Sequence, residues 1–136
     1  MEFPKIDERF SMQQHDHVFF DVLEAPRTDF AIVAPKMGGG APIYNALGHL
    51  EISTGKYEKY YPGNTHLLQE PVFISRGEAE GDGWLLVLVN DLKEGFSELH
   101  LVDTKDFSKP QARILLPIRL RPALHGNWVD ASELHH

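Results

Sequence analysis

The stretch Trp84-Leu-Leu-Val-Leu-Val89 is the longest apolar run in the chain and decides which folds it can adopt. A run of this length cannot cross a bilayer, which needs about 20 apolar residues in a helix, so the sequence predicts no transmembrane segment. A short apolar run between glycine-rich and polar segments is typical of a buried β-strand. Because its residues are apolar on both faces, we expect this strand to be covered on both sides.

Alternating segments on either side of this run predict further strands. Ser97–Asp103 places leucines on one face and His100 with Val102 on the other. Ala46–Ser53 and Lys56–Tyr61 alternate around a Thr-Gly turn, which is a hairpin signal. Shorter runs predict four more strands, at Val18–Phe20, Phe30–Ala34, Glu70–Ser75 and Gln111–Leu116. No segment shows a convincing helical period. The chain is therefore predicted to be all-β, as in a sandwich, a barrel or propeller blades.

Length and composition exclude several classes of protein. The 136 residues carry 20 Asp and Glu against 13 Lys and Arg, and a net charge of −7 argues against a general nucleic-acid binder. The absence of Cys excludes disulfide scaffolds, thiolate metal sites and thiol nucleophiles. The N-terminus does not resemble a signal peptide, so we expect a cytoplasmic protein. Gly38–Gly40 lacks the ending of a phosphate-binding loop and predicts a flexible turn.

His125 is the strongest candidate metal ligand among the eight histidines. It lies in Pro122-Ala-Leu-His-Gly-Asn-Trp128, where Gly126 allows close approach of the backbone. We expect Leu124 and Trp128 to exclude water from the imidazole. A neutral histidine in a dry setting is a good ligand for a transition metal. The alternative is a core histidine with a satisfied hydrogen bond.

The other histidines give weaker indications. His15 and His17 are two residues apart, which places both on one face of a strand. With Glu24 they are also compatible with a small cupin-like metal barrel. The rest are predicted to be ordinary: His49 and His100 as outward or wall residues of strands, His66 in a loop, and His135 and His136 in the terminal segment.

Two glutamates share a local context. Glu70 precedes Pro71 and an apolar strand, and a carboxylate at the mouth of a buried strand needs a partner. Because a metal-bound histidine commonly donates its second N–H to a carboxylate, Glu70 is a candidate partner for a histidine. Glu2 in Glu2-Phe-Pro4 has the same local form. An exposed, solvated glutamate is the alternative at both positions.

A set of ordered segments carries a resemblance to a known family. They are Glu2-Phe-Pro-Lys-Ile-Asp-Glu-Arg-Phe10, Glu70-Pro-Val-Phe-Ile-Ser-Arg76, Gly81-Asp-Gly-Trp-Leu-Leu-Val-Leu-Val-Asn-Asp91, Ser97-Glu-Leu-His-Leu-Val-Asp103, Ala112-Arg-Ile-Leu-Leu-Pro117 and Leu124-His-Gly-Asn-Trp128. Together they resemble the C-terminal part of the carotenoid cleavage oxygenase family. The motifs Ile6-Asp-Glu-Arg9 and Leu124-His-Gly-Asn-Trp128 are similar to those of the stilbene-cleaving, lignostilbene dioxygenase branch.

The resemblance implies a fold and a chemistry. Members of that family form a seven-bladed β-propeller in which four histidines hold Fe(II), and three of these are steadied by glutamates. The iron binds dioxygen, and a C=C bond of a hydrophobic conjugated substrate is cleaved to two carbonyl products. By motif, His125 corresponds to the last iron ligand, and Glu70 and Glu2 to two of the steadying glutamates. Leu124 is expected to face the substrate space.

The resemblance also implies that residues 1–136 are a single C-terminal segment of an incomplete propeller and not an autonomous domain. The family chain is longer, and three ligand-bearing segments have no counterpart here, so we expect the isolated chain to be inactive. Its expected partners are the missing N-terminal blades or a second copy of the chain. Two alternatives stay open: a non-catalytic β-rich binding module derived from such an enzyme, and the cupin-like barrel.

Overall fold

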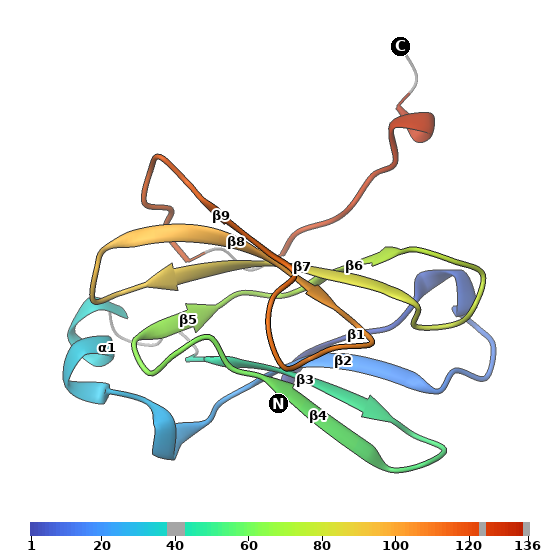
Figure 1. Cartoon of the computed structure of the whole chain (residues 1–136), viewed down its shortest axis with the longest axis horizontal. Coiled ribbons are helices and arrows are strands. Elements are labelled where there is room, and N and C mark those ends of the chain that lie inside the picture. Colours follow the sequence, from blue (N-terminus) through green and yellow to red (C-terminus); the bar gives the residue numbers. More distant parts are fainter. Residues whose placement is uncertain (38–42, 123–124, 135–136) are drawn as a thin grey trace.

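The computed structural model describes residues 1–37, 43–122 and 125–134, and it forms two antiparallel sheets that lie in two layers (Figure 1). Sheet A has the order β1 (Glu2–Lys5), β2 (His17–Val22), β3 (Ala46–Glu51) and β4 (Lys56–Tyr60). Sheet B has the order β5 (His66–Leu68), β7 (Gly83–Asp91), β8 (Phe96–Asp103) and β9 (Ala112–Leu115), and β6 (Val72–Ser75) also pairs with β7. The helical elements are α1 (Phe30–Met37), η1 (Glu8–Phe10), η2 (Ala25–Arg27) and η3 (Ala131–Glu133). No helix in the described part of the chain is long and apolar enough to cross a membrane.

The main core lies between the two sheets. Phe19 is fully buried and stacks on Phe73 of sheet B, with ring centroids 5.5 Å apart, and on Phe107, 6.3 Å away. The cluster as a whole contains Phe19, Leu47, Tyr60, Leu68, Leu85, Val87, Val89, Val102 and Phe107. Burial of these side chains from both sheets is what holds the layers together.

A buried polar chain also joins the two sheets. The hydroxyl of Tyr60, on β4, lies 2.6 Å from Nδ1 of His100 on β8. Nε2 of His100 lies 2.7 Å from the Glu98 carboxylate, which also accepts two hydrogen bonds from Arg113. Because Glu98 is an acceptor, His100 carries its proton on Nε2 and accepts from Tyr60 on Nδ1. This Tyr60–His100–Glu98 chain crosses the interface without leaving a histidine nitrogen unpaired.

The expected outward positions of His49 and His100 are therefore wrong. His49 is 7% exposed and His100 is 1% exposed, and both side chains point into the interface between the two sheets. Alternation correctly placed His100 and Val102 on one face, but that face is the buried one. His66 begins β5, half-buried, although the sequence predicted it in a loop.

The strand expected at Phe30–Ala34 is also wrong, because these residues belong to α1. Asp29 begins the helix: its side-chain carboxylate accepts from the Ile32 N–H and its carbonyl from the Val33 N–H. Val33 is fully buried and packs with Leu67 and other apolar residues beside the sheets. The apolar β-branched residues suggested a strand, whereas the Asp29 cap and this single buried side chain favour a short helix. The predicted turn at 38–40 lies outside the described residues.

The remaining predicted strands correspond to β2, β3, β4, β6, β7, β8 and β9. The expectation that β7 is covered on both faces is wrong, because only one of its faces is fully buried. Leu85, Val87 and Val89 are buried between the sheets, whereas Trp84, Leu86 and Leu88 on the other face are half-buried.

Replacing Gly83 by Ala is expected to destabilise this packing by about 2–3 kcal/mol. A Cβ at Gly83 would lie 2.1 Å from the Ile74 carbonyl oxygen and 2.9 Å from the Phe73 ring, so β6 would have to move away from β7. Urea unfolding of the variant measures the loss. Gly95→Ala is the control, since a Cβ there meets nothing within 4 Å and only the positive φ adds a cost of about 1 kcal/mol. Equal losses in the two variants would contradict this account of Gly83.

Candidate metal-binding site

Glu70 and His125, which are 55 residues apart in the sequence, meet in the structure. Nδ1 of His125 lies 2.5 Å from Oε2 of Glu70. The side chain of Glu70 is only 5% exposed, whereas that of His125 is 72% exposed. An ionised carboxylate can only accept, so Nδ1 is the donor and the neutral ring carries its lone pair on Nε2. The pair therefore orients an imidazole and leaves Nε2 as its ligand atom.

Lys5 completes the surroundings of Glu70. Its ammonium lies 2.5 Å from Oε1 of Glu70, so each carboxylate oxygen has its own partner. Burial by itself would raise the pKa of Glu70, but the hydrogen bonds from Lys5 and His125 outweigh it and lower this pKa below the ordinary value. Glu70 is thus held in the ionised form that histidine orientation requires. No sequence pattern singled out Lys5, although it lies in the Glu2–Phe10 segment.

Phe3 packs on the histidine from β1. Its ring meets the His125 ring edge to face, with centroids 5.9 Å apart, and meets Tyr44 in the same way at 5.9 Å. The register of β1 on β2 shifts between Glu2 and Lys5, and Phe3 adopts a φ of 51°. A left-handed φ is strained for an aromatic residue, and an irregularity of this kind re-aims a side chain. Here the strained turn of β1 directs Phe3 to the imidazole.

Asp21 is a buried carboxylate beside the pair. It is fully buried on β2, and neither oxygen has a hydrogen-bond partner. Burial raises the pKa of Asp21 to about 7, and the negative charge of Glu70 adds to the rise. No sequence pattern singled out Asp21. Its position opposite Glu2 depends on the pairing of β1 with β2, which is irregular.

The other residues expected at the site are placed differently. Glu2 is exposed at the start of β1, and its partner is not among the described contacts. Leu124 lies outside the described residues. The expectation of a dry setting for His125 is wrong, because Trp128 is 44% exposed and the segment from His125 to Leu134 runs over the surface. Figure 1 shows this segment running away from the two sheets towards the C-terminus, and the described residues place no further layer over it.

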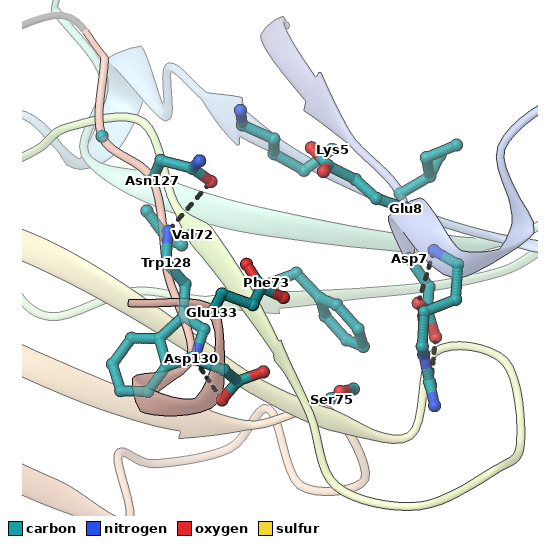
Figure 2. Close-up of a pocket in the computed structure, with 13 residues that line it drawn as sticks. Lys5, Asp7, Glu8, Val72, Phe73, Ser75, Asn127, Trp128, Asp130 and Glu133 are labelled. Carbon is teal, nitrogen blue, oxygen red and sulfur yellow. Dashed lines mark hydrogen bonds and ion pairs between the residues drawn. The ribbon is translucent and has the colours of Figure 1, made fainter. Parts of the chain in front are cut away.

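A cavity of about 200 Å³ adjoins the histidine through Gly126. Most of its lining residues are charged or polar, which does not suit an apolar conjugated molecule, so it is not a candidate substrate space. Figure 2 shows Asn127, Trp128, Asp130 and Glu133 on one side of this cavity, and Lys5, Asp7 and Glu8 on the other.

The other described histidines are engaged elsewhere. His15 lies 3.4 Å from the Gln13 carbonyl, His66 is 3.6 Å from Asp91, and His17 contacts His49. Glu24 pairs with Lys59, so the cupin-like site of His15, His17 and Glu24 does not form. Within the described ranges, the group of three or more ligand side chains close enough to share an ion is Asp16, His17 and Glu51, which does not include His125. Among the described residues, His125 therefore belongs to no group of three ligand side chains.

Comparison with known proteins gives consistent matches along the chain. The family model described as Retinal pigment epithelial membrane protein matches residues 1–130. Resveratrol cleavage oxygenase 1 of Aspergillus fumigatus is 53% identical over 136 residues, and lignostilbene-alpha,beta-dioxygenase isozyme III of Sphingomonas paucimobilis is 37% identical over 136. Each match covers 98% of this chain and 27% of the relative. The chain thus spans about a quarter of the length of these curated relatives.

Solved structures agree with this result. The lignostilbene dioxygenase of Pseudomonas brassicacearum superimposes with a TM-score of 0.82 at 36% identity, covering 94% of this chain and 27% of that one. An apocarotenoid oxygenase of Synechocystis gives 0.80 at 23% identity, covering 96% and 25%, and supports the fold alone. The prediction of a β fold that is an incomplete part of a propeller is confirmed, since the chain is mostly strands and matches 27% of a solved enzyme of this family.

Proposed function

Because the chain belongs to the carotenoid cleavage oxygenase family, we propose that it contributes to an Fe(II)-dependent dioxygenase that cleaves a C=C bond of a conjugated substrate. The relatives in the comparison are named for cleavage of resveratrol, carotenoids and lignostilbene. The relatives at 53% and 47% identity are named for cleavage of resveratrol and of carotenoids, so a stilbene-type and a carotenoid substrate both fit the proposal. Fe(II), when bound, supplies the redox chemistry by which dioxygen converts the alkene to two carbonyl products.

The observation that carries the proposal is the contact between Glu70 and His125. A metal-bound histidine characteristically donates its second nitrogen to a carboxylate, which fixes the tautomer and the ring orientation. Here Nδ1 is held by Glu70 and Nε2 is the available nitrogen. The donor therefore fits an iron ligand in both its chemistry and its tautomer.

Each neighbouring residue has a role in this proposal. Lys5 keeps Glu70 ionised and fixed, and Phe3 limits rotation of the imidazole by edge-to-face packing. Glu2 is assigned the orientation of another histidine ligand, which is not among the described residues. None of these residues attacks the substrate, so the proposed contribution of this chain is to position one ligand.

We further propose that residues 1–136 act as a single C-terminal segment and not as an autonomous enzyme. One imidazole cannot hold Fe(II) with useful affinity, because geometry and affinity depend on the number of ligands. The remaining ligands would come from the other blades of a longer chain. The isolated chain is accordingly expected to lack cleavage activity.

A chimera tests this proposal. Residues 1–136 replace the matched portion of the Pseudomonas brassicacearum lignostilbene dioxygenase, and both bound iron and stilbene cleavage are measured. We expect the chimera to bind iron and cleave the substrate, and His125→Ala to abolish both. Glu70→Gln should weaken iron binding about 10–100-fold, because the ligand loses its orienting carboxylate.

Glu78→Gln, at an exposed glutamate in the loop after β6, is the matched control and should leave iron binding unchanged. A folded chimera that keeps its iron and activity without His125 would overturn the proposal. A folded chimera that binds no iron and cleaves no substrate would instead favour the binding-module alternative.

A further inference from the structure

Asp7 and Arg9, from the Ile6-Asp-Glu-Arg9 motif, fasten the segment after β1 to the loop of residues 77–82, which joins β6 to β7. Arg9 donates from Nε and Nη2 to the two carboxylate oxygens of Asp7, at 2.9 and 2.6 Å. The pair also contacts three backbone groups of the loop: the Gly77 carbonyl at 2.5 Å, the Ala79 carbonyl at 3.4 Å and the Gly81 N–H at 3.3 Å. These contacts are called the Asp7–Arg9 clasp below.

The acidic half of the clasp is buried. Asp7 is 1% exposed, and it begins η1 by accepting a hydrogen bond from the Arg9 N–H. Burial would raise the pKa of Asp7, but its hydrogen bonds from Arg9 and Gly81 outweigh burial and lower this pKa. A forked guanidinium on a buried, ionised carboxylate defines the geometry more closely than an exposed ion pair does.

A second attachment joins the same two segments at the other end of β6. Lys5, on β1, pairs with Glu70, which precedes β6, whereas the clasp holds the loop that follows β6. Between the two attachments lies the cavity of about 200 Å³, which residues of both segments line (Figure 2). The backbone of β1 pairs with β2 and that of β6 with β7, so side-chain contacts set the separation of β1 from β6.

The position of Lys5 depends on such a restraint. The register of β1 on β2 shifts between Glu2 and Lys5, and a lysine side chain has many rotamers. His125 depends on β6 as well, because a Cβ at Gly126 would lie 3.3 Å from the Val72 side chain. A displacement of β1 relative to β6 therefore disturbs the carboxylate of Glu70 and the imidazole that it orients.

We propose that Asp7 and Arg9 are positioning residues for the Glu70–His125 pair and act through β1 and β6 without touching the imidazole. When the clasp is lost, the end of β1 is released and Lys5 no longer fixes Glu70, so His125 loses its fixed tautomer. The inference rests on the proposed function only in that His125 is taken as an iron ligand. The orientation of His125 by Glu70 can be measured without iron.

NMR of the 136-residue chain with ¹⁵N-labelled histidine tests the orientation. The ring nitrogens are observed at about pH 8, above the ordinary histidine pKa, and His125→Ala identifies the His125 signals. We expect His125 to be protonated on Nδ1 in the wild type and to become a mixture of tautomers in Arg9→Ala. Arg9→Lys should give an intermediate result, because it keeps the charge but loses the fork.

Arg76→Ala is the matched control, because Arg76 holds the same loop from the side of sheet B. Its guanidinium donates to Asp82 at 2.8 Å and to both oxygens of Asp103, at 2.7 and 3.1 Å. Removing these contacts loosens the loop without releasing β1. We expect Arg76→Ala to lower the Tm, as Arg9→Ala does, and to leave the tautomer of His125 unchanged.

The chimera with the lignostilbene dioxygenase extends the test to iron. In competition with a chelator, Arg9→Ala should weaken Fe(II) binding about 3–10-fold and Arg76→Ala by less than about twofold. An unchanged tautomer in Arg9→Ala, or equal losses of iron affinity in the two variants, overturns the proposal and leaves the clasp a purely structural contact. A wild-type chimera without iron, together with a changed tautomer in Arg9→Ala, rejects the proposed function and upholds the positioning role.

Discussion

Replacing Glu98 by Ala is expected to lower the free energy of unfolding by about 2–3 kcal/mol, because a buried donor loses its charged acceptor. Glu98 is 6% exposed and is the acceptor for His100 and Arg113. Without its carboxylate, the buried Nε2–H of His100 has no partner, and the link to Tyr60 loses its fixed tautomer. A small domain is stable by only 5–15 kcal/mol, so the loss is a large share of the total.

The pH dependence of this loss has a defined sign. Burial raises the pKa of Glu98, but the hydrogen bonds from His100 and Arg113 outweigh it and lower the pKa below its ordinary value. A group with a lowered pKa stabilises the fold above the pKa of the unfolded chain, and this stabilisation is lost as the pH falls through the folded value. The difference between wild type and Glu98→Ala should therefore shrink below about pH 4.5.

Urea unfolding at pH 7 and at pH 4 measures both effects. Arg113→Ala is the control, because the Arg113 side chain is 53% exposed and its ion pair is worth less than about 1 kcal/mol. If Glu98→Ala costs no more than Arg113→Ala, the chain of Tyr60, His100 and Glu98 does not join the sheets energetically.

Asp21→Asn is expected to act in the opposite direction and to stabilise the chain by about 2–4 kcal/mol at pH 7. Asp21 has a pKa raised to about 7 in the fold, against 3.8 as its ordinary value. The unfolded chain releases this proton near pH 4, whereas the folded chain keeps it until about pH 7. The stabilisation from the protonated acid is complete below the unfolded pKa and is lost as the pH rises through the folded one, and Asn removes this loss.

Stability profiles between pH 4 and pH 7 distinguish the two proteins. The wild type should lose stability across this interval relative to Asp21→Asn, and the two should converge at pH 4. Asp130→Asn, at an exposed residue without a buried environment, should change stability by no more than about 0.5 kcal/mol. Parallel profiles would mean that Asp21 is ionised and has found a partner in the fold.

The sequence predicted most strands because alternation is a local property. β7, β8 and the β3–β4 hairpin follow from side chains two residues apart. The same alternation cannot say which face of a strand is covered, and so His49 and His100 were assigned to the wrong side. Likewise α1 is too short to show a helical period, and its signal was the Asp29 cap.

The site was predictable in part, and by a different route. The motif resemblance identified Glu70 and His125 separately, and their contact follows from the way the segment after β9 returns to β6. Lys5, Phe3 and Asp21 could not be found, because their positions depend on the irregular register of β1 on β2. The exposure of His125 was missed for a similar reason: neighbouring apolar residues in sequence do not become a lid unless another layer lies above them.

The half-buried face of β7 has a consequence for how a propeller is put together. Leu85 and its neighbours at alternate positions are already satisfied by sheet A, whereas Leu86 and Leu88 still expose apolar surface. Such surface gains roughly 25 cal/mol per Å² once it is covered. In a propeller, where sheets stack face against face, covering this side of β7 with a further sheet would add to the stability of the whole.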